Sequence, residues 1–288
     1  MASETWTVRR LLEWTEDFLR KKGFESPRLE AQILLAHALG CKKIDLYVRH
    51  DEEPAEDKRA AFREMIKKRS EGMPVAYLVG HREFYSLEFA VSPAVLIPRP
   101  ETETLVMEAL RRLKPLAAPR VLDIGTGSGV IAVAIAKQHQ AARIAAVDVS
   151  AAALTVAASN AQRHGVADRV TFLEGDLFGP VAGQAFDLIV SNPPYIADAE
   201  FASLDVGVRE FEPRAALAGG PDGLDFYRRI AADAASFLSP GGTVVVEIGA
   251  TQEAAVRELF AARLEPGPSF KDAAGRPRVA TANSRPGS

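Results

Sequence analysis

The sequence predicts a doubly wound α/β domain with a parallel sheet, preceded by a small helical domain. After residue 100, apolar segments of strand length alternate with Ala-rich helical segments, which is the pattern of a parallel sheet covered by helices. Residues 1–72 instead show apolar side chains at helical spacing and end at Gly72. A chain of 288 residues is long enough to form two domains.

Composition excludes several classes of protein. With 47% hydrophobic and 25% charged residues, the chain is neither disordered nor fibrous. A net charge of -3 provides no global positive field for nucleic acid or an anionic membrane. The single cysteine, Cys41, cannot form an internal disulfide, and no Cys/His metal motif occurs, so we expect a metal-free cytoplasmic protein. No segment resembles a signal peptide or a membrane span.

Three helices and a hairpin are expected before the α/β domain. Apolar spacing and the Ser26-Pro27 pair predict a helical domain at residues 1–74, with helices at Thr7–Lys22, Pro27–Leu39 and Pro54–Arg69. Short β-prone pieces then predict a β-hairpin at residues 75–97 that joins the two domains.

The second domain is expected at residues 98–288. Its apolar runs predict buried strands at Arg120–Ile124, Arg143–Val149, Val170–Leu173, Phe186–Val190 and Gly242–Ile248. A later segment, Arg278–Thr281, is a candidate for a last strand at the edge of the sheet.

A glycine-rich loop follows the first of these strands and leads into a helix. It consists of Gly125, Thr126, Gly127, Ser128 and Gly129. Glycine permits positive φ angles and lets a ligand touch the backbone, and the start of a helix has unpaired N–H groups. We therefore expect a nucleotide-like or carboxylate group there. The dinucleotide fingerprint needs a small residue where this chain has Val130, which disfavours NAD.

Acidic residues end the next two strands. Asp148 follows the glycine loop by about twenty residues, the position at which a carboxylate accepts both ribose hydroxyls. We expect Asp176 beside an adenine amino group and Leu177 against the adenine ring. Because ligands of open α/β sheets bind at the carboxyl ends of the strands, one pocket should contain all these groups.

The fourth strand runs into Asn192, Pro193, Pro194 and Tyr195, which is the most specific signal in the chain. Prolines have no N–H, so the backbone here presents carbonyl acceptors, to which the Asn192 side chain adds an amide oxygen. Two such acceptors hold both hydrogens of a planar NH2 group, and Tyr195 can cover that group from one side. These four residues are the candidate catalytic residues.

Methylation is the chemistry that suits this arrangement. An amide nitrogen is a poor nucleophile, so its reaction needs a reactive methyl donor such as a sulfonium, alignment, and dipoles that stabilise positive charge on nitrogen. A general base is not required, because the proton can leave after the methyl group has arrived.

In these residues the chain resembles the protein-(glutamine-N5) methyltransferases of the HemK/PrmC family, which modify peptide chain release factors with S-adenosylmethionine. The resemblance covers nearly the whole chain. Its motifs are Gly80–Tyr85, Leu96–Glu103, Gly125–Gly129, Asn192–Tyr195, Glu212–Arg214 and Lys271–Arg276.

The resemblance implies a Rossmann-like class I methyltransferase domain and a helical domain that helps to recognise the release factor. It implies that Asn192 and Pro193 bind the glutamine amide of a Gly-Gly-Gln tip, with Asn192 also close to the donor. It places the glycine loop, Asp148 and the Asp176-Leu177 pair on S-adenosylmethionine, and the loop containing Arg99 and Glu103 at the edge of the same pocket. A monomer is expected.

Three other functions remain open at this point. An N6-adenine methyltransferase of DNA or RNA would use the same acceptor chemistry, but it needs a basic stripe, whereas the cationic runs here have acidic neighbours. A ribosomal-protein glutamine methyltransferase would differ in its docking domain. A non-catalytic binding module would be expected to lose the glycine loop or Asn192, and both are intact.

Overall fold

The computed structural model describes residues 5–285, which form two compact units. The first unit comprises the described residues up to Gly80 together with Asp205–Phe211, and the second comprises His81–Leu204 and Glu212 onwards. Two features differ from expectation. Val75–Val79, expected within the hairpin linker, is a short helix, α5, of the first unit. The segment Asp205–Phe211, expected in the second domain, also belongs to the first unit.

The first unit is helical, as its apolar spacing predicts. Its three longer helices begin and end within two residues of the expected positions. They pack around buried Leu34, Leu35 and Phe62. The helices are α1 (Val8–Lys21), α2 (Pro27–Leu39), α3 (Asp45–Val48), α4 (Glu56–Ser70), α5 (Val75–Val79) and α9 (Val206–Phe211).

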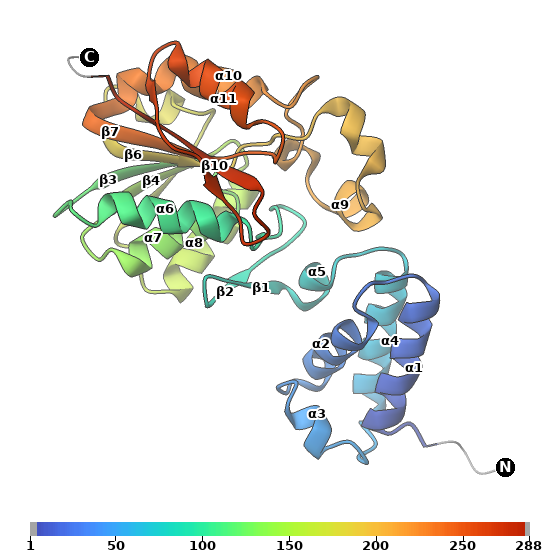
Figure 1. Cartoon of the computed structure of the whole chain (residues 1–288). Helices are drawn as coiled ribbons and strands as arrows, with labels where there is room; N and C mark the ends of the chain where they lie inside the picture. The colour runs from blue at the N-terminus through green and yellow to red at the C-terminus, as the bar shows by residue number, and fades with distance from the viewer. Residues whose placement is uncertain (1–4, 286–288) are drawn as a thin grey trace. The chain divides into compact units, whose positions relative to one another are not determined.

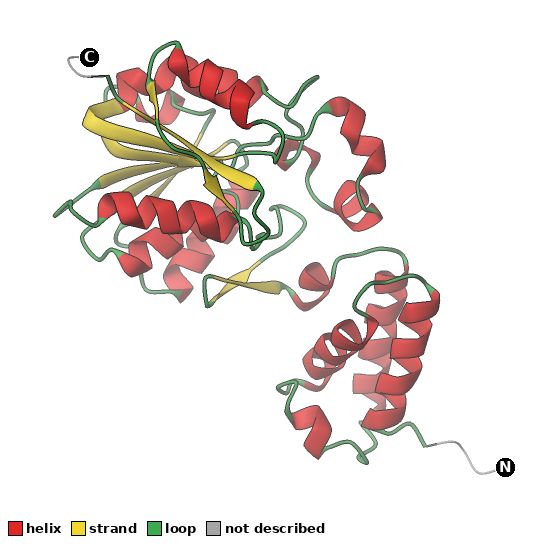
Figure 2. Ribbon diagram, in the orientation of Figure 1, coloured by secondary structure: helices red, strands yellow, loops and turns green. Residues whose placement is uncertain are grey.

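The second unit is a twisted sheet with helices on both faces (Figures 1 and 2). Helices α6, α7 and α8 lie on one face, and α10 and α11 lie on the other (Figure 1). The strands of the main sheet are β3 (Arg120–Ile124), β4 (Arg143–Asp148), β5 (Val170–Glu174), β6 (Phe186–Ser191), β7 (Leu238–Glu247), β8 (Glu265–Pro266), β9 (Phe270–Lys271) and β10 (Pro277–Asn283). The helices are α6 (Thr102–Leu113), α7 (Val130–Gln138), α8 (Ala151–Arg163), α10 (Asp225–Asp233) and α11 (Glu253–Ala261), with 3-10 turns at Gly179–Val181, Asp198–Ser203, Arg214–Ala216 and Ala234–Phe237.

The sheet is mixed. Strands β5, β4, β3, β6 and β7 are neighbours in that order and are parallel, as predicted, whereas β10 pairs with β7 in the antiparallel direction. The prediction that Arg278–Thr281 forms an edge strand is wrong. Strands β8 and β9 pair with the other side of β10, because the chain doubles back along it after α11.

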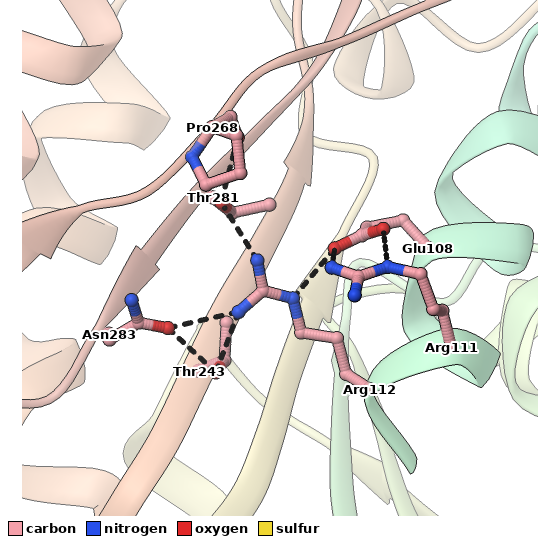
Figure 3. A network of polar contacts seen from close by, with 7 residues as sticks. All are labelled: Glu108, Arg111, Arg112, Thr243, Pro268, Thr281 and Asn283. Carbon is pink, nitrogen blue, oxygen red and sulfur yellow. Dashed lines mark hydrogen bonds and ion pairs between the residues drawn. The ribbon is translucent and has the colours of Figure 1, made fainter. Parts of the chain in front are cut away.

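Helix α6 is fastened to β7 and β10 by a polar network near its C-terminal end (Figure 3). The Arg112 guanidinium donates to Asn283 Oδ1 at 2.9 Å, to Thr243 Oγ1 at 3.2 Å and to Thr281 Oγ1 at 3.2 Å. Buried Glu108 accepts from Arg112 Nε at 2.7 Å, so the guanidinium has partners on both the helix and the sheet. This network fixes the position of α6, whose first residue, Thr102, reaches the candidate site.

The hairpin formed by β1 (His81–Phe84) and β2 (Leu87–Ala90) is held to α8 by Asn160. Asn160 Oδ1 accepts from Ala90 N at 2.8 Å, and Nδ2 donates to Ala90 O at 3.0 Å and to Ser128 O at 2.8 Å. The side chain is fully buried. One amide therefore connects the hairpin, the helix and the glycine loop.

Replacing Asn160 with alanine should destabilise the protein by about 3 kcal/mol, because buried backbone groups of Ala90 and Ser128 lose their partners. Urea denaturation of the variant measures this loss. Ser159→Ala, on an exposed position of the same helix, is the control and should change the free energy of unfolding little. Equal stability of the two variants would contradict the role of Asn160.

Candidate active site

The parallel register brings four strand ends to one edge of the sheet. Ile124 of β3 lies opposite Val147 of β4 and Ser191 of β6, and Ser191 lies opposite Val246 of β7. The residues that follow these positions are therefore neighbours at the carboxyl edge, although they are far apart in sequence. They are Gly125, Asp148, Asn192 and Glu247.

A cavity of about 200 Å³ opens at this edge. Its lining includes eight of the predicted site residues: Gly125, Gly127, Asp148, Asp176, Leu177, Asn192, Pro193 and Pro194. Residues that sequence reasoning missed also line it, among them Val95, Leu96, Ser150 and Phe226. A larger groove of about 970 Å³ lies elsewhere, between α1 and α4.

The glycine loop takes the backbone shape that the sequence predicts. Gly125 and Gly127 have φ angles of 70° and 56°, and a Cβ on either would project into open space. Gly129, at φ 81°, instead abuts Ala157, where a Cβ would lie 3.0 Å from that of Ala157. The open space beside Gly125 and Gly127 leaves room for a ligand against the backbone. The missing side chain of Gly129 allows the start of α7 to lie close to α8.

Four backbone N–H groups of the loop itself, which precedes the first residue of α7, already have partners. Gly125 N and Thr126 N donate to Val147 O at 2.8 and 3.0 Å, Gly127 N donates to Asp148 Oδ2 at 2.8 Å, and Gly129 N donates to Thr126 O at 2.8 Å. Backbone donors in a buried turn need partners, and the end of β4 supplies three of them. Within the loop, Thr126 and Ser128 are buried.

Asp148 is oriented by the backbone around it. Its Oδ2 accepts from Gly127 N and its Oδ1 accepts from Ser150 N at 2.9 Å. A carboxylate has about four acceptor positions, so each oxygen can take a further hydrogen bond from a ligand. The carboxylate is thus held at the cavity without using its full acceptor capacity.

Asp176 and Leu177 differ in how firmly they are held. The Asp176 side chain is 58% exposed and forms an ion pair with Arg229. Leu177 is buried and has a φ of 46°, a left-handed conformation that is rare for a leucine. Such strain is found at ligand clamps when the surrounding structure enforces it.

The Asn192 amide is oriented by Thr102. Its Nδ2 donates to Thr102 Oγ1 at 3.2 Å, so Oδ1 lies on the other side of the amide. Within residues 5–285, neither Asn192 Oδ1 nor the Pro193 carbonyl oxygen accepts a hydrogen bond. Asn192 therefore offers an acceptor oxygen at the cavity.

Tyr195, expected to cover the NH2 group, is outside the cavity lining, and its hydroxyl lies beside Glu247, a buried carboxyl that sequence reasoning missed. Its hydroxyl lies 3.4 Å from Glu247 Oε1, and burial next to this carboxyl raises the pKa of Tyr195 to about 12. Glu247 ends an apolar run, as Asp148 does, and that shared signal could have identified it. Thr102 had no comparable signal beyond its place in the Leu96–Glu103 motif.

Arg99 and Glu103, predicted at the edge of the pocket, are outside the cavity lining and contact the protein itself. Arg99 Nη2 lies 2.5 Å from Oε1 of buried Glu212, whose Oε2 accepts from Ile97 N at 3.1 Å. Glu103 Oε1 accepts from Tyr85 N at 2.9 Å. Both side chains connect separate segments of the second unit.

A second buried carboxyl lies beneath the glycine loop. Asp123 is fully buried and accepts from Thr126 Oγ1 at 2.6 Å, while its Oδ1 has no hydrogen bond of normal geometry from the described residues, although the backbone N–H of Ala132 is close enough to lower the pKa of the carboxyl. Burial raises the pKa of Asp123 to about 7, despite the hydrogen bond from Thr126. Between about pH 4 and pH 7 the folded protein therefore holds a proton that the unfolded chain has released.

Because of that proton, the free energy of unfolding should fall as the pH rises from 4 to about 7. Asp123→Asn cannot ionise, so its stability should vary less with pH over this range in urea denaturation. Asp168→Asn, on a side chain that is 74% exposed, is the control and should keep the wild-type pH dependence. An unchanged slope in Asp123→Asn would exclude this role.

Comparison with known proteins gives the family. The family models for the PrmC N-terminal domain and the methyltransferase small domain match residues 10–80 and 102–211. The release factor glutamine methyltransferase of Rhodopirellula baltica is 54% identical over 84% of this chain and 84% of its own length. That of Geobacter sulfurreducens is 50% identical over 89% of each chain.

A solved structure supports the fold. The hMettl16 catalytic domain has a TM-score of 0.57 to this chain at 16% identity, covering 78% of this chain and 83% of its own. The predicted class I methyltransferase fold is confirmed, and so is the resemblance read from the motifs. The chain belongs to the release factor glutamine methyltransferase family.

Proposed function

We propose that this protein transfers the methyl group of S-adenosylmethionine to the side-chain amide nitrogen, N5, of the glutamine in the Gly-Gly-Gln motif of peptide chain release factors. The family supplies the methyl donor and the class of substrate. The observation that supports the acceptor is the orientation of Asn192, whose nitrogen is bound to Thr102 and whose oxygen is left for a ligand at the cavity.

Two acceptors define the group that this site can hold. Asn192 Oδ1 and the Pro193 carbonyl each accept one hydrogen of a planar NH2 group, which fits the terminal amide of glutamine. Held in this way, the nitrogen can be aligned with the donor methyl group, and alignment of this kind contributes about 7 to 11 kcal/mol. The same two oxygens stabilise the positive charge that develops on nitrogen.

The strand-end cavity is suited to the donor. Gly125 and Gly127 leave room for the ligand along the backbone, Asp148 is positioned to accept from ribose hydroxyls, and Leu177 supplies an apolar surface for the adenine ring. Bound there, S-adenosylmethionine supplies an electrophilic methyl group on a sulfonium. After transfer the nitrogen is acidic enough to release its proton to water, so no general base is needed.

The helical unit is proposed to contribute to release factor recognition. Its groove between α1 and α4 is lined by Trp6, Trp14 and Phe18, and Trp14 is 49% exposed. No helix within the described range 5–285 has the length and apolar character needed to cross a membrane. We further propose a cytoplasmic monomer that acts on protein and not on nucleic acid, in line with its net charge of -3.

The proposed function is tested by incubating the full-length protein with S-adenosylmethionine labelled on the methyl group. One arm contains a purified release factor, a second contains duplex DNA, and a third contains ribosomal protein. Label on the glutamine of the release factor supports the proposal, and mass spectrometry locates it. Label on DNA or on ribosomal protein alone, or no label, would overturn it.

Asn192→Ala removes one of the two acceptors and should lower the transfer rate by about 100- to 1000-fold. Donor affinity, measured by calorimetry, should remain within a few fold because the glycine loop and Asp148 are unchanged. Turnover close to the wild-type rate would rule out this role for Asn192.

Asp148→Ala should weaken donor binding by about tenfold or more, since the carboxylate is expected to accept from the ribose. Glu174→Ala is the matched control, because Glu174 is exposed at the end of β5 and does not line the cavity. Calorimetry with S-adenosylmethionine compares the two variants. The same dissociation constant for both would exclude ribose binding by Asp148.

A further inference from the structure

Glu247 is a buried carboxyl that lies outside the cavity lining. It is the last residue of β7 and is 1% exposed. The register that places Val246 opposite Ser191 also places Glu247 beside Asn192. Burying a carboxyl without an ion-pair partner is costly, so its retention at this point requires compensating contacts.

The contacts of Glu247 lead to the acceptor side of the site. Oε1 lies 3.4 Å from the Tyr195 hydroxyl. Oε2 is buried without a hydrogen bond of normal geometry from the described residues, although the Thr102 hydroxyl is close enough to lower the pKa of the carboxyl. Thr102 Oγ1 in turn accepts from Asn192 Nδ2 at 3.2 Å. Polar contacts therefore run from the Glu247 carboxyl to the Thr102 hydroxyl and from there to the Asn192 amide.

The direction of the hydrogen bonds along this chain decides what the site can bind. A carboxylate only accepts, so it draws the single hydrogen of the Thr102 hydroxyl towards itself. The Thr102 oxygen then faces Asn192 as an acceptor. An asparagine amide has nearly the same shape in both orientations, so only such partners decide which end faces the ligand. With Nδ2 turned to Thr102, Oδ1 faces the substrate.

We propose that Glu247 is a positioning residue. Its carboxylate orients the Thr102 hydroxyl and thereby holds Asn192 with its amide oxygen towards the NH2 group of the acceptor, and it anchors Tyr195 in the same way. This inference rests on the proposed function, because it explains how the Asn192 amide is kept with its oxygen, and not its NH2 group, facing the substrate. Glu247 itself does not contact the substrate.

The charge on Glu247 should then control turnover. The titratable groups that face it among the described residues are Glu101 at the start of α6, Tyr195 after β6, Tyr227 on α10, whose hydroxyl donates to Glu247 O at 2.8 Å, and Arg278 on β10. Burial raises the pKa of Glu247 to about 7, against the opposite effects of Thr102 and Arg278. Below that pH the carboxyl carries its own hydrogen, and Thr102 is no longer required to donate to it.

The test measures kcat for methylation of a release factor at saturating S-adenosylmethionine, from about pH 6 to about pH 8.5. The wild-type kcat should fall as the pH drops through about 7. Glu247→Gln mimics the protonated carboxyl, so its kcat should be independent of pH and close to the low-pH value of the wild type. The kcat of Glu247→Ala should be about tenfold lower than that of Glu247→Gln, because only the Gln side chain keeps a polar group beside Thr102.

Two further variants separate this role from a loss of fold. Thr102→Val keeps the shape of the side chain without its hydroxyl and should lower kcat as Glu247→Ala does, with donor affinity unchanged in calorimetry. Glu174→Gln alters an exposed glutamate at the end of β5, outside the cavity lining, and should keep the wild-type pH profile.

The outcomes are distinguishable. If the wild type fails to methylate the release factor, the proposed function is wrong. If the wild type is active and Glu247→Gln keeps the acid limb near pH 7, the titrating group is not Glu247 and this inference is overturned. A wild-type kcat in Thr102→Val would overturn it as well. Should Glu247→Ala not fold, the Gln and Thr102 variants still decide the question.

Discussion

The parallel register of β3, β6 and β7 is the constraint on which the rest of the site depends. A backbone hydrogen-bond ladder aligns Ile124, Ser191 and Val246, so the residues after them emerge at the same level of the sheet edge. The glycine loop, Asn192 and Glu247 thereby become neighbours without being close in sequence. A slip of one residue would turn each strand's side chains to the opposite face and separate these groups.

Helix α6 connects this edge to the opposite end of the sheet. Its first residue, Thr102, contacts Asn192, while Arg112, which also donates to Glu108, binds its last turn to β7 and β10. A helix is stiff over twelve residues, so a contact that fixes one end also fixes the other. Buried polar networks of this kind are costly when incomplete, which makes them effective at specifying a single position.

Several motifs that carry the family resemblance fasten the fold around the site. Arg99 binds Glu212, Glu103 binds the hairpin backbone at Tyr85, and Glu101 lies 3.6 Å from Arg276. These contacts join four separate segments of the second unit near the start of α6. A charged residue in a signature motif can therefore serve to hold the polypeptide in place, which explains why Arg99 and Glu103 do not line the cavity.

The sequence by itself determined the α/β class, the glycine loop, Asp148 and the Asn192–Tyr195 segment, because strand periodicity, glycine and proline act locally on the backbone. Only the tertiary structure decided that β10 lies inside the sheet, that Asp205–Phe211 belongs to the helical unit, and that four N–H groups of the glycine loop are already paired. It also decided the environment of Glu247. Burial, pairing and proton affinity arise from contacts between distant segments, and no local pattern encodes those contacts.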